Sequence, residues 1–283
     1  GALACDGVSL ATLADRYGTP LHVVSEAAIR AAHARVDGAL ADLPHLVCYA
    51  MKANGSPGIV RLLGSLGAGV DVVSGGELHW ALRSGIPPGR IVMSGVGKTD
   101  DEIRAALAAG VRSLHVESEP ELAIVEGLAE AAGVRARIGL RVNPNVDPKT
   151  HPYIATGLHE TKFGLELEIA RALVPRIVRS AHLELTCITC HVGSQIRDLG
   201  ALEEATAITG AFLGEARELG AAVSTLDPGG GWPVTYGDED EPYPTEDEIG
   251  AAIRRGLRTA GLLDEPPTIV VEPGRALVAD AET

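Results

Sequence analysis

The sequence predicts a TIM-like (β/α)8 barrel, an α/β fold in which eight parallel strands alternate with helices. Eight short runs rich in Val, Ile and Leu recur along the chain, and helical patterns separate them. The alternation extends over about 240 residues, close to the roughly 250 that such a barrel needs. A doubly wound open sheet is the competing architecture, because it repeats the same unit of strand and helix.

The predicted strands are the apolar runs, each short enough to be buried in a parallel sheet. They cover residues 46–50, 69–73, 90–94, 112–116, 136–142, 183–190, 223–227 and 268–272. Ahead of them, residues 1–24 form an N-terminal segment whose short amphipathic piece ends at Gly18 and Pro20. A helical pattern then runs from Ser25 to Leu40 and leads into the first strand.

Helix starts are predicted where a Ser or Thr is followed three residues later by Glu. The hydroxyl and the carboxylate can then satisfy backbone N–H groups that the first helical turn leaves free. The four pairs are Ser74 with Glu77, Thr99 with Glu102, Ser118 with Glu121, and Thr245 with Glu248. These pairs support the repeated order of strand, loop and helix.

The composition excludes several classes of protein. A formal net charge of −14 without a Lys/Arg cluster argues against a nucleic-acid partner. No apolar run is long enough to span a membrane, and no signal-peptide pattern opens the chain. The four cysteines are too scattered for a disulfide framework, so we expect a reducing, cytoplasmic compartment. Cys187 and Cys190 have the CxxC spacing, but no second pair completes a ligand set, and we predict no metal site.

Lys52 stands where an apolar strand runs into a glycine-rich loop, within the sequence YAMKAN at 49–54. A lone ammonium is costly to bury unless it is paired or used chemically, so this lysine is a candidate reactive amine. A surface lysine that happens to follow a strand is the ordinary alternative. In a barrel the chemistry lies at the C-terminal ends of the strands, which is where Lys52 falls.

Two loops near the end of the chain contain residues suited to binding an anion. Gly229, Gly230 and Gly231 follow the seventh strand and can expose backbone N–H groups without side-chain obstruction. Arg275 follows the eighth strand, and its guanidinium can add charge-assisted hydrogen bonds to a phosphate. Ser194 can add a hydroxyl to the same anion. Taken alone, the glycine triplet could equally be a flexible turn.

Glu272 and His191 each end an apolar strand. A buried carboxylate at Glu272 is expensive unless it faces a cation, such as a protonated pyridine nitrogen. His191 is either a packed core residue or an imidazole that lies flat against an aromatic ring. A lysine, a phosphate cradle, an acidic partner and a stacking ring are together what pyridoxal 5′-phosphate requires. The residues therefore predict a site for that cofactor.

With these motifs the chain resembles the barrel-type pyridoxal-phosphate decarboxylases, and the likeness covers nearly the whole chain. YAMKAN at 49–54, HVGSQ at 191–195, the glycine triplet at 229–231 and EPGR at 272–275 resemble the wider superfamily. The run RVNPNVDPKTHPYIATGLHETKFG at 141–164, together with HVGSQ, resembles the diaminopimelate branch and is the most specific signal.

The resemblance implies a role for each matching residue. Lys52 would hold the cofactor, His191 would stack on its ring, and Glu272 would face the pyridine nitrogen. Asp71 and Arg141 would belong to the hydrogen-bond shell around the cofactor. The phosphate would be bound by Ser194, Gly229, Gly230, Gly231, Gly274 and Arg275.

The implied activity is decarboxylation of meso-2,6-diaminopimelate to L-lysine and carbon dioxide by a homodimer, with Arg275 close to the substrate. The barrel would span 25–275. Residues 276–283 would begin the connection to the family's second, β-rich domain, with which residues 1–24 would pair. That domain, which carries a proton-donating cysteine, is not in this sequence. We therefore expect the 283-residue form to have little turnover of its own.

Two alternatives stay open. A related decarboxylase would act on ornithine, arginine, carboxynorspermidine or a carrier-bound amino acid. A non-catalytic cofactor-binding barrel would keep Lys52 and the phosphate loops but would need no substrate domain. One departure from the family pattern is Thr189, which stands where a histidine is expected; we predict that it packs and takes no part in the chemistry.

Overall fold

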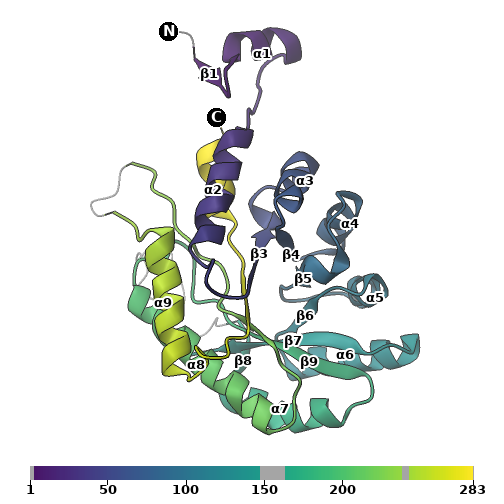
Figure 1. Cartoon of the computed structure of the whole chain (residues 1–283). Coiled ribbons are helices and arrows are strands. Elements are labelled where there is room, and N and C mark those ends of the chain that lie inside the picture. The colour runs from purple at the N-terminus through teal and green to yellow at the C-terminus, as the bar shows by residue number, and fades with distance from the viewer. Residues whose placement is uncertain (1–2, 147–162, 238–241, 283) are drawn as a thin grey trace.

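The computed structural model describes residues 3–146, 163–237 and 242–282, and the statements below concern these residues. In this part of the chain, eight parallel strands close into a barrel in the order β3, β4, β5, β6, β7, β9, β10, β11, with β11 paired back to β3. Closure rules out the open doubly wound sheet. Helices lie around the outside of the strands (Figure 1).

Every predicted strand is confirmed. A short apolar run between turn signals is typical of a buried strand, and each of the eight runs forms one. The barrel strands are β3 (His45–Ala50), β4 (Gly69–Val72), β5 (Ile91–Met93), β6 (Ser113–Val116), β7 (Ala136–Asn143), β9 (Leu183–Thr189), β10 (Thr225–Asp227) and β11 (Thr268–Val271). Three strands were not predicted, since two residues leave no recognisable pattern: β1 (Ala4–Cys5), β2 (Val8–Ser9) and β8 (Leu165–Glu166).

The helices alternate with the strands as the (β/α)8 pattern requires. They are α1 (Leu10–Tyr17), α2 (Glu26–Gly38), α3 (Pro57–Ser65), α4 (Gly75–Arg83), α5 (Asp100–Ala109), α6 (Glu119–Ala132), α7 (Leu167–Arg179), α8 (Leu199–Glu218), α9 (Glu246–Thr259) and α10 (Arg275–Val278). Short 3-10 turns are η1 (Met51–Ala53), η2 (Pro88–Arg90) and η3 (Ala279–Ala281). None of the described helices combines the length and the apolar character needed to cross a membrane.

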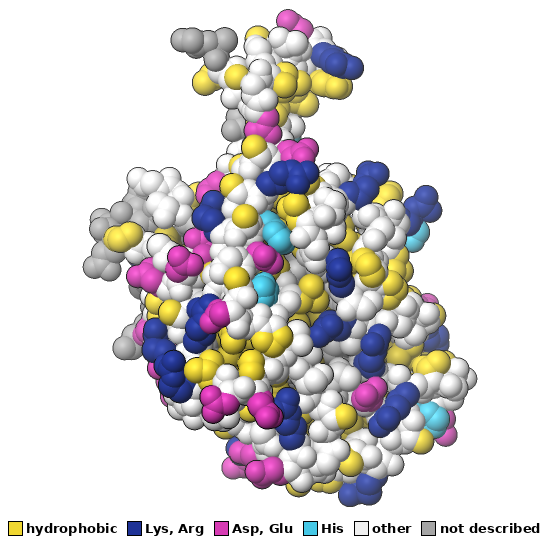
Figure 2. All heavy atoms as spheres, in the orientation of Figure 1, with side chains coloured by type: hydrophobic (Ala, Val, Ile, Leu, Met, Phe, Trp, Pro, Cys, Tyr) yellow, Lys and Arg dark blue, Asp and Glu magenta, His cyan; other side chains and the backbone are white. Residues whose placement is uncertain are grey.

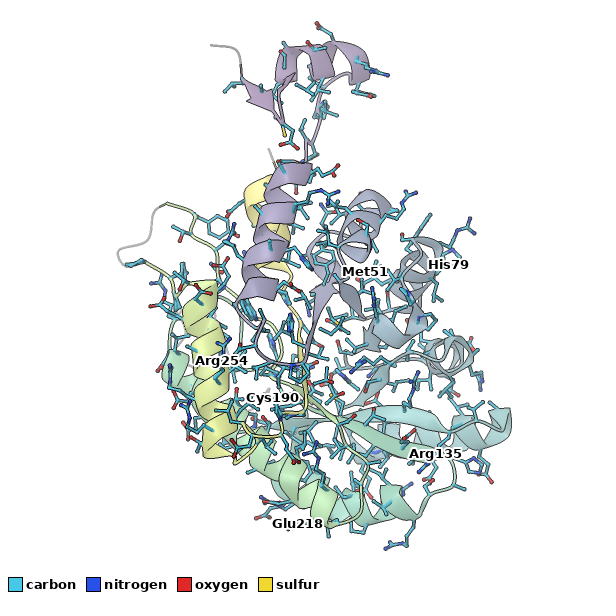
Figure 3. All side chains as sticks on the ribbon, in the orientation of Figure 1. Met51, His79, Arg135, Cys190, Glu218 and Arg254 are labelled. Carbon is cyan, nitrogen blue, oxygen red and sulfur yellow. The ribbon has the colours of Figure 1, made fainter. Side chains whose placement is uncertain are left out.

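Two groups of buried apolar side chains hold the barrel together. The larger one lies between the helices and the outer faces of the strands and includes Met51 and Cys190, both labelled in Figure 3. The smaller one consists of Cys48, Val92 and Val270 from three different strands. Because successive side chains of a strand point to opposite faces, this second group fills the inside of the barrel. All cysteines in the described residues are unpaired.

The four predicted helix starts are all N-caps, but they divide into two kinds. Thr99 and Thr245 form complete capping boxes with the Glu three residues later. At Ser74 and Ser118 the hydroxyl caps the helix, but the Glu side chain accepts the N–H of the residue before the cap. Both serines have φ −154°, a more extended backbone than that of Thr99 (φ −76°) and Thr245 (φ −75°). With the extended backbone, the Glu side chain bonds to the N–H one residue before the cap. In this way Glu77, in the first turn of α4, bonds to Val73, the residue that directly follows β4, and links the strand to the helix.

The N-terminal segment stands apart from the barrel (Figures 1 and 2). Its helix α1 has no buried residue. Asp6 connects the segment to the barrel by accepting hydrogen bonds from the Ser25 hydroxyl and the Ala27 N–H. The end of the described chain runs beside the same junction, since Val24 forms an antiparallel bridge with Glu282.

Replacing Thr245 with Ala removes the side-chain cap of α9 and is expected to lower the free energy of unfolding by about 1 kcal/mol. Ser56 is the N-cap residue of α3 but makes no side-chain cap bond, so Ser56→Ala is a matched control that should change far less. Urea denaturation of both variants measures the difference. Equal losses would show that the capping bonds of Thr245 do not stabilise the fold.

Candidate functional site

Polar side chains gather at the C-terminal ends of the barrel strands, as the fold predicts for a functional site. We call this set the mouth, and its members are Lys52, Asp71, Ser94, His115, Glu117, Arg141, His191, Asp227 and Glu272. The Ala50 N–H donates to the Pro273 carbonyl at 3.1 Å, which ties the end of β3 to the loop after β11. The lysine near the start of the chain and the EPGR loop near its end therefore meet in one place.

Lys52 supplies the accessible amine of the mouth. The described residues contain one other lysine, Lys98, whose side chain is only 1% exposed. The Lys98 amine is fully engaged, because it donates to the Gly95 and His115 carbonyls at 2.6 Å and to Glu121 at 2.7 Å. The side chain of Lys52, by contrast, is 59% exposed. Of these two amines, only that of Lys52 is free to react.

Asp71 holds the lysine amine in position. Its carboxylate is buried, and its Oδ2 lies 3.6 Å from the Lys52 Nζ. The Ser94 hydroxyl donates to the other carboxylate oxygen. Burial raises the pKa of Asp71, while the charge of Lys52 opposes that rise. Asp71 was predicted as a site residue, whereas Ser94 was not.

Arg141 lies on the other side of the mouth and is paired with Glu117 through a contact of 2.7 Å. Its guanidinium also lies over the ring of Phe163, 5.4 Å from the centroid. Most of the specific run at 141–164 lies outside the described residues. Glu117 was not predicted, although it directly follows β6 and stands two residues after His115, a spacing that directs both side chains to the same side if the extended backbone continues.

The glycine triplet is packed too tightly for any side chain. A Cβ on Gly230 would lie 2.2 Å from the Glu272 carbonyl oxygen, and one on Gly231 would lie 2.1 Å from that of Gly193. Gly229 and Gly231 also have positive φ values of 85°. The triplet therefore lets the loops after β9, β10 and β11 approach one another, a role that the sequence did not predict.

Hydrogen bonds inside the protein engage two of the triplet's N–H groups. Gly229 donates to Asp227 at 2.8 Å, and Gly230 donates to the Nδ1 of His191 at 3.3 Å. That nitrogen of His191 is therefore an unprotonated acceptor. His191 is exposed at the mouth, but crowding by the surrounding protein, and then the charges of Arg141 and Lys52, lower the pKa of its imidazole. The imidazole is uncharged at neutral pH, as suits a ring that stacks.

The remaining predicted phosphate ligands lie on the segments that follow β9 and β11. Ile196 donates its N–H to the Gly231 carbonyl at 3.0 Å, which brings the loop containing Ser194 against the triplet. Gly274 begins α10, and a Cβ there would lie 3.3 Å from that of Ala50. The exposed Arg275 donates to the Tyr236 hydroxyl, on the chain that continues from the triplet.

Glu272 lies at the bottom of the mouth with Asp227 and His115. Burial, and then the Asp227 charge, raise the pKa of Glu272 well above its usual value. Its Oε1 is buried without a hydrogen-bond donor among the described residues. A protonated ring nitrogen would satisfy that oxygen, so the residues present fit pyridoxal phosphate. The three side chains also offer donor atoms within 4.8 Å of one another, which a metal ion could use; the expected lack of a metal stays a prediction.

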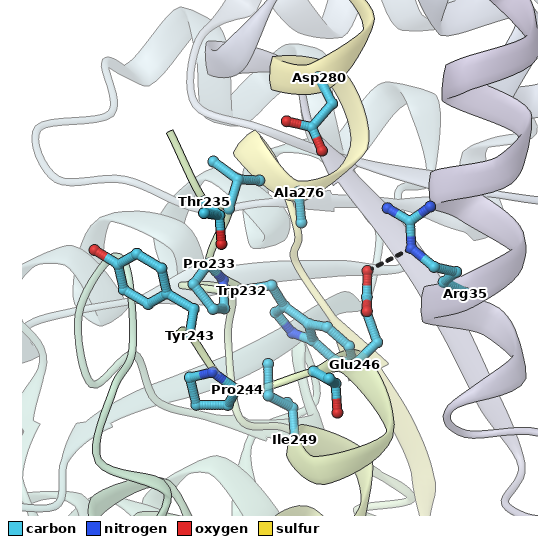
Figure 4. A pocket seen from close by; sticks show the side chains of 12 residues that line it. Arg35, Trp232, Pro233, Thr235, Tyr243, Pro244, Glu246, Ile249, Ala276 and Asp280 are labelled. Carbon is cyan, nitrogen blue, oxygen red and sulfur yellow. Dashed lines mark hydrogen bonds and ion pairs between the residues drawn. The ribbon is translucent and has the colours of Figure 1, made fainter. Parts of the chain in front are cut away.

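A separate cavity of about 230 Å³ lies outside the mouth, between α2, α9 and the chain after the triplet (Figure 4). Trp232, Pro233 and Tyr243 line it, and the ion pair of Arg35 with Glu246 at 2.8 Å crosses one side. None of the predicted site residues lines this cavity.

Three polar residues of the mouth besides Ser94 escaped the sequence-based prediction: His115, Glu117 and Asp227. Each is buried and stands at or just after the end of a strand. That combination of strand position and polar type was the available signal. Thr189 is buried in β9, as predicted for a packing residue.

Gly230→Ala would force the triplet away from the end of β11, and overpacking of this kind costs about 1–3 kcal/mol of stability. Gly89→Ala is the matched control, because a Cβ at Gly89 meets nothing within 4 Å. Thermal or urea unfolding of the two variants gives the comparison. A Gly230→Ala protein as stable as the wild type would contradict the close approach of these loops.

Comparison with known proteins agrees with this architecture. A family profile described as "Pyridoxal-dependent decarboxylase, pyridoxal binding domain" matches residues 26–279. The diaminopimelate decarboxylase of Pseudomonas aeruginosa is 44% identical over an aligned length of 283 residues, and the alignment covers 99% of this chain and 66% of the relative. The chain thus spans a little less than two thirds of that relative.

Solved structures show the same likeness. The diaminopimelate decarboxylase from Helicobacter pylori complexed with L-lysine has a TM-score of 0.89 and 38% identity, over 96% of this chain and 67% of the other. A lysine/ornithine decarboxylase from Vibrio vulnificus complexed with putrescine has a TM-score of 0.78 and 26% identity, over 96% and 68%. Both the fold and the sequence are thus more similar to the first of these two.

Proposed function

Because the chain belongs to the family of pyridoxal-dependent decarboxylases, we propose that it forms the cofactor-binding barrel of an enzyme that converts meso-2,6-diaminopimelate into L-lysine and carbon dioxide. Its relatives named diaminopimelate decarboxylase are 37–44% identical to it. One solved relative of that name is complexed with L-lysine. The lower identity to a lysine/ornithine decarboxylase, 26%, disfavours ornithine as the substrate.

The observation that carries the proposal is the meeting of an accessible amine with a buried acid at one mouth. Lys52 comes from the end of β3 and Glu272 from the end of β11, and the bond between Ala50 and Pro273 holds these ends together. The tightly packed glycine triplet lies against the same loop. An amine, an acid and a glycine loop in this arrangement support cofactor chemistry over a purely structural barrel.

The chain's own residues would bind and orient the cofactor. When bound, pyridoxal phosphate draws electrons away from the α-carbon of an amino acid, which lets the carboxyl group leave as carbon dioxide. The residues that would hold it are Lys52, Asp71, Arg141, His191, Ser194, Gly229, Gly230, Gly231, Glu272, Gly274 and Arg275.

Each side chain has a separate task in this proposal. Asp71 directs the Lys52 amine into the mouth through their ion pair at 3.6 Å. His191, kept uncharged, offers a flat ring that would not repel a cationic cofactor ring. Arg275, exposed beside Tyr236, provides a positive charge for an anionic group of the cofactor or substrate.

The N-terminal segment would complete a second domain with chain beyond the barrel. The Ser25 N–H donates to the Ala281 carbonyl at 2.8 Å, and His22 contacts Glu282 at 2.9 Å. Leu3, Val8 and Tyr17 of this segment are exposed, which leaves apolar surface for such a partner.

A homodimer in the cytoplasm stays a prediction, and sedimentation of the full-length enzyme would test the dimer.

Lys52→Ala is expected to abolish the visible absorbance that pyridoxal phosphate gains when a lysine of the protein holds it. Borohydride reduction of the wild type, followed by peptide mass spectrometry, should place the cofactor on the peptide that contains Lys52. A cofactor attached to Lys98 or to another lysine would contradict the assignment. Retained absorbance in Lys52→Ala would do the same.

Carbon dioxide release by the full-length enzyme tests the substrate. We expect meso-diaminopimelate to be used with a kcat/KM at least about 100-fold above those for ornithine and arginine, because those two substrates lack its distal carboxylate, and a site built to pair that carboxylate rejects analogues without it. A preference for ornithine, arginine or carboxynorspermidine would replace the proposed substrate. No release from any amino acid would favour a non-catalytic barrel.

A further inference from the structure

Asp227, Glu272 and His115 form a buried polar cluster at the bottom of the mouth, which we call the acid floor. Asp227 and His115 are almost completely buried, and the Glu272 side chain is 10% exposed. Asp227 Oδ2, Glu272 Oε1 and His115 Nε2 have no hydrogen-bond partner within the described part of the chain. Buried polar atoms without partners are rare, so three together need an explanation.

A proton shared by the two carboxyl groups accounts for two of these atoms. Ionised carboxylates only accept hydrogen bonds, so if both were ionised, neither Asp227 nor Glu272 could donate a hydrogen bond to the other. One proton turns one carboxyl into a donor, and carboxyl oxygens of the two groups lie within 4.8 Å of each other, where each group shifts the pKa of the other. The Nδ1 of His115 does not donate a hydrogen bond to Glu272, because it lies 3.8 Å from Glu272 Oε1.

The surroundings place the proton on Glu272. The Gly229 N–H donates to Asp227 Oδ1 at 2.8 Å, which favours the ionised form of Asp227. No backbone donor of this kind contacts the Glu272 carboxyl in the described residues. Burial and the neighbouring negative charge raise the pKa of Glu272 well above its usual value, and burial raises that of Asp227 to about 7.

The other charged groups that face Asp227 and Glu272 do not move the proton from Glu272 to Asp227. Asp71 on β4 adds negative charge and favours the protonated form of Glu272, whereas Lys52 on η1 favours the ionised form. Arg141 on β7 is already paired with Glu117. Burial, and then Lys98 and Arg141, lower the pKa of His115 to about 3, so this ring contributes no charge.

We propose that Asp227 is a positioning residue that keeps a proton on Glu272 in the cofactor-free enzyme, ready for transfer to a basic ring nitrogen. The inference rests on the proposed function, because that nitrogen belongs to pyridoxal phosphate. The O–H bond of Glu272 breaks, an N–H bond forms, and Glu272 remains as the carboxylate that pairs with the new cation. Asp227 neither gains nor loses a proton, and the total charge of the site is unchanged.

The pH dependence of pyridoxal phosphate binding to the cofactor-free, full-length protein tests this role. Affinity should fall as the pH rises past the point where Glu272 loses its proton. In Asp227→Asn the neighbouring negative charge is gone, so the folded-state pKa of Glu272 drops and the fall should move to lower pH by about one unit or more. Asp264→Asn makes the same change at an exposed site and should match the wild type.

Infrared difference spectroscopy gives a second readout, and its first comparison uses only the wild type, so it does not depend on whether a variant folds. The cofactor-free protein should have a protonated-carboxyl band that disappears when pyridoxal phosphate binds. The band should be missing from Glu272→Gln, which has no acid to protonate. A band that survives binding, or one that persists in Glu272→Gln, would overturn the proposal.

The possible failures are distinguishable. If the wild type binds no pyridoxal phosphate at any pH, the proposed function fails and this inference falls with it. If binding occurs but its pH profile is the same in Asp227→Asn, the role of Asp227 alone is refuted. Tight binding of zinc to the cofactor-free protein that His115→Ala abolishes would also refute it, because a metal would replace the shared proton.

Discussion

The parallel pairing of β11 with β3 is the contact on which the site depends. It joins Ile269 through Val271 to His45 through Val47 and closes the sheet. Beyond the paired residues, the bond between Ala50 and Pro273 continues the contact into the loops that carry Lys52 and Glu272. Without this closure the amine and the acid would stand on opposite edges of an open sheet.

Charged side chains in the mouth and beside it are paired with opposite charges, and the acid floor departs from this rule. Lys52 with Asp71, Lys98 with Glu121, and Arg141 with Glu117 each set a cation beside an anion. Burying one such charge alone would be costly, and the pairing offsets much of that cost. At the floor two acids meet beside an uncharged histidine, and no ion pair with a lysine or arginine joins either acid in the described residues. This excess of acidic side chains lies where a cationic group of a ligand would bind.

Much of the fold could be predicted because its signals are local. Apolar runs located all the strands of the barrel, and a Ser or Thr located four helix starts. The site was predicted in part, since Lys52, Glu272 and the glycine triplet belong to recognisable motifs. Asp227 and His115 were missed because a single polar residue in a short strand is common, and its importance depends on which side chains face it. The close packing of Gly230 against Glu272 likewise depends on which loops meet in space.

The late position of β11 in the chain has a consequence for how the protein is made. Lys52 leaves the ribosome early, while the residues that complete its surroundings are among the last of the barrel to be synthesised. Domains fold as units during translation, so a nascent chain without its final strand has no closed sheet to nucleate around the lysine. A prosthetic group that needs both Lys52 and Glu272 can therefore be bound fully only after β11 has paired with β3.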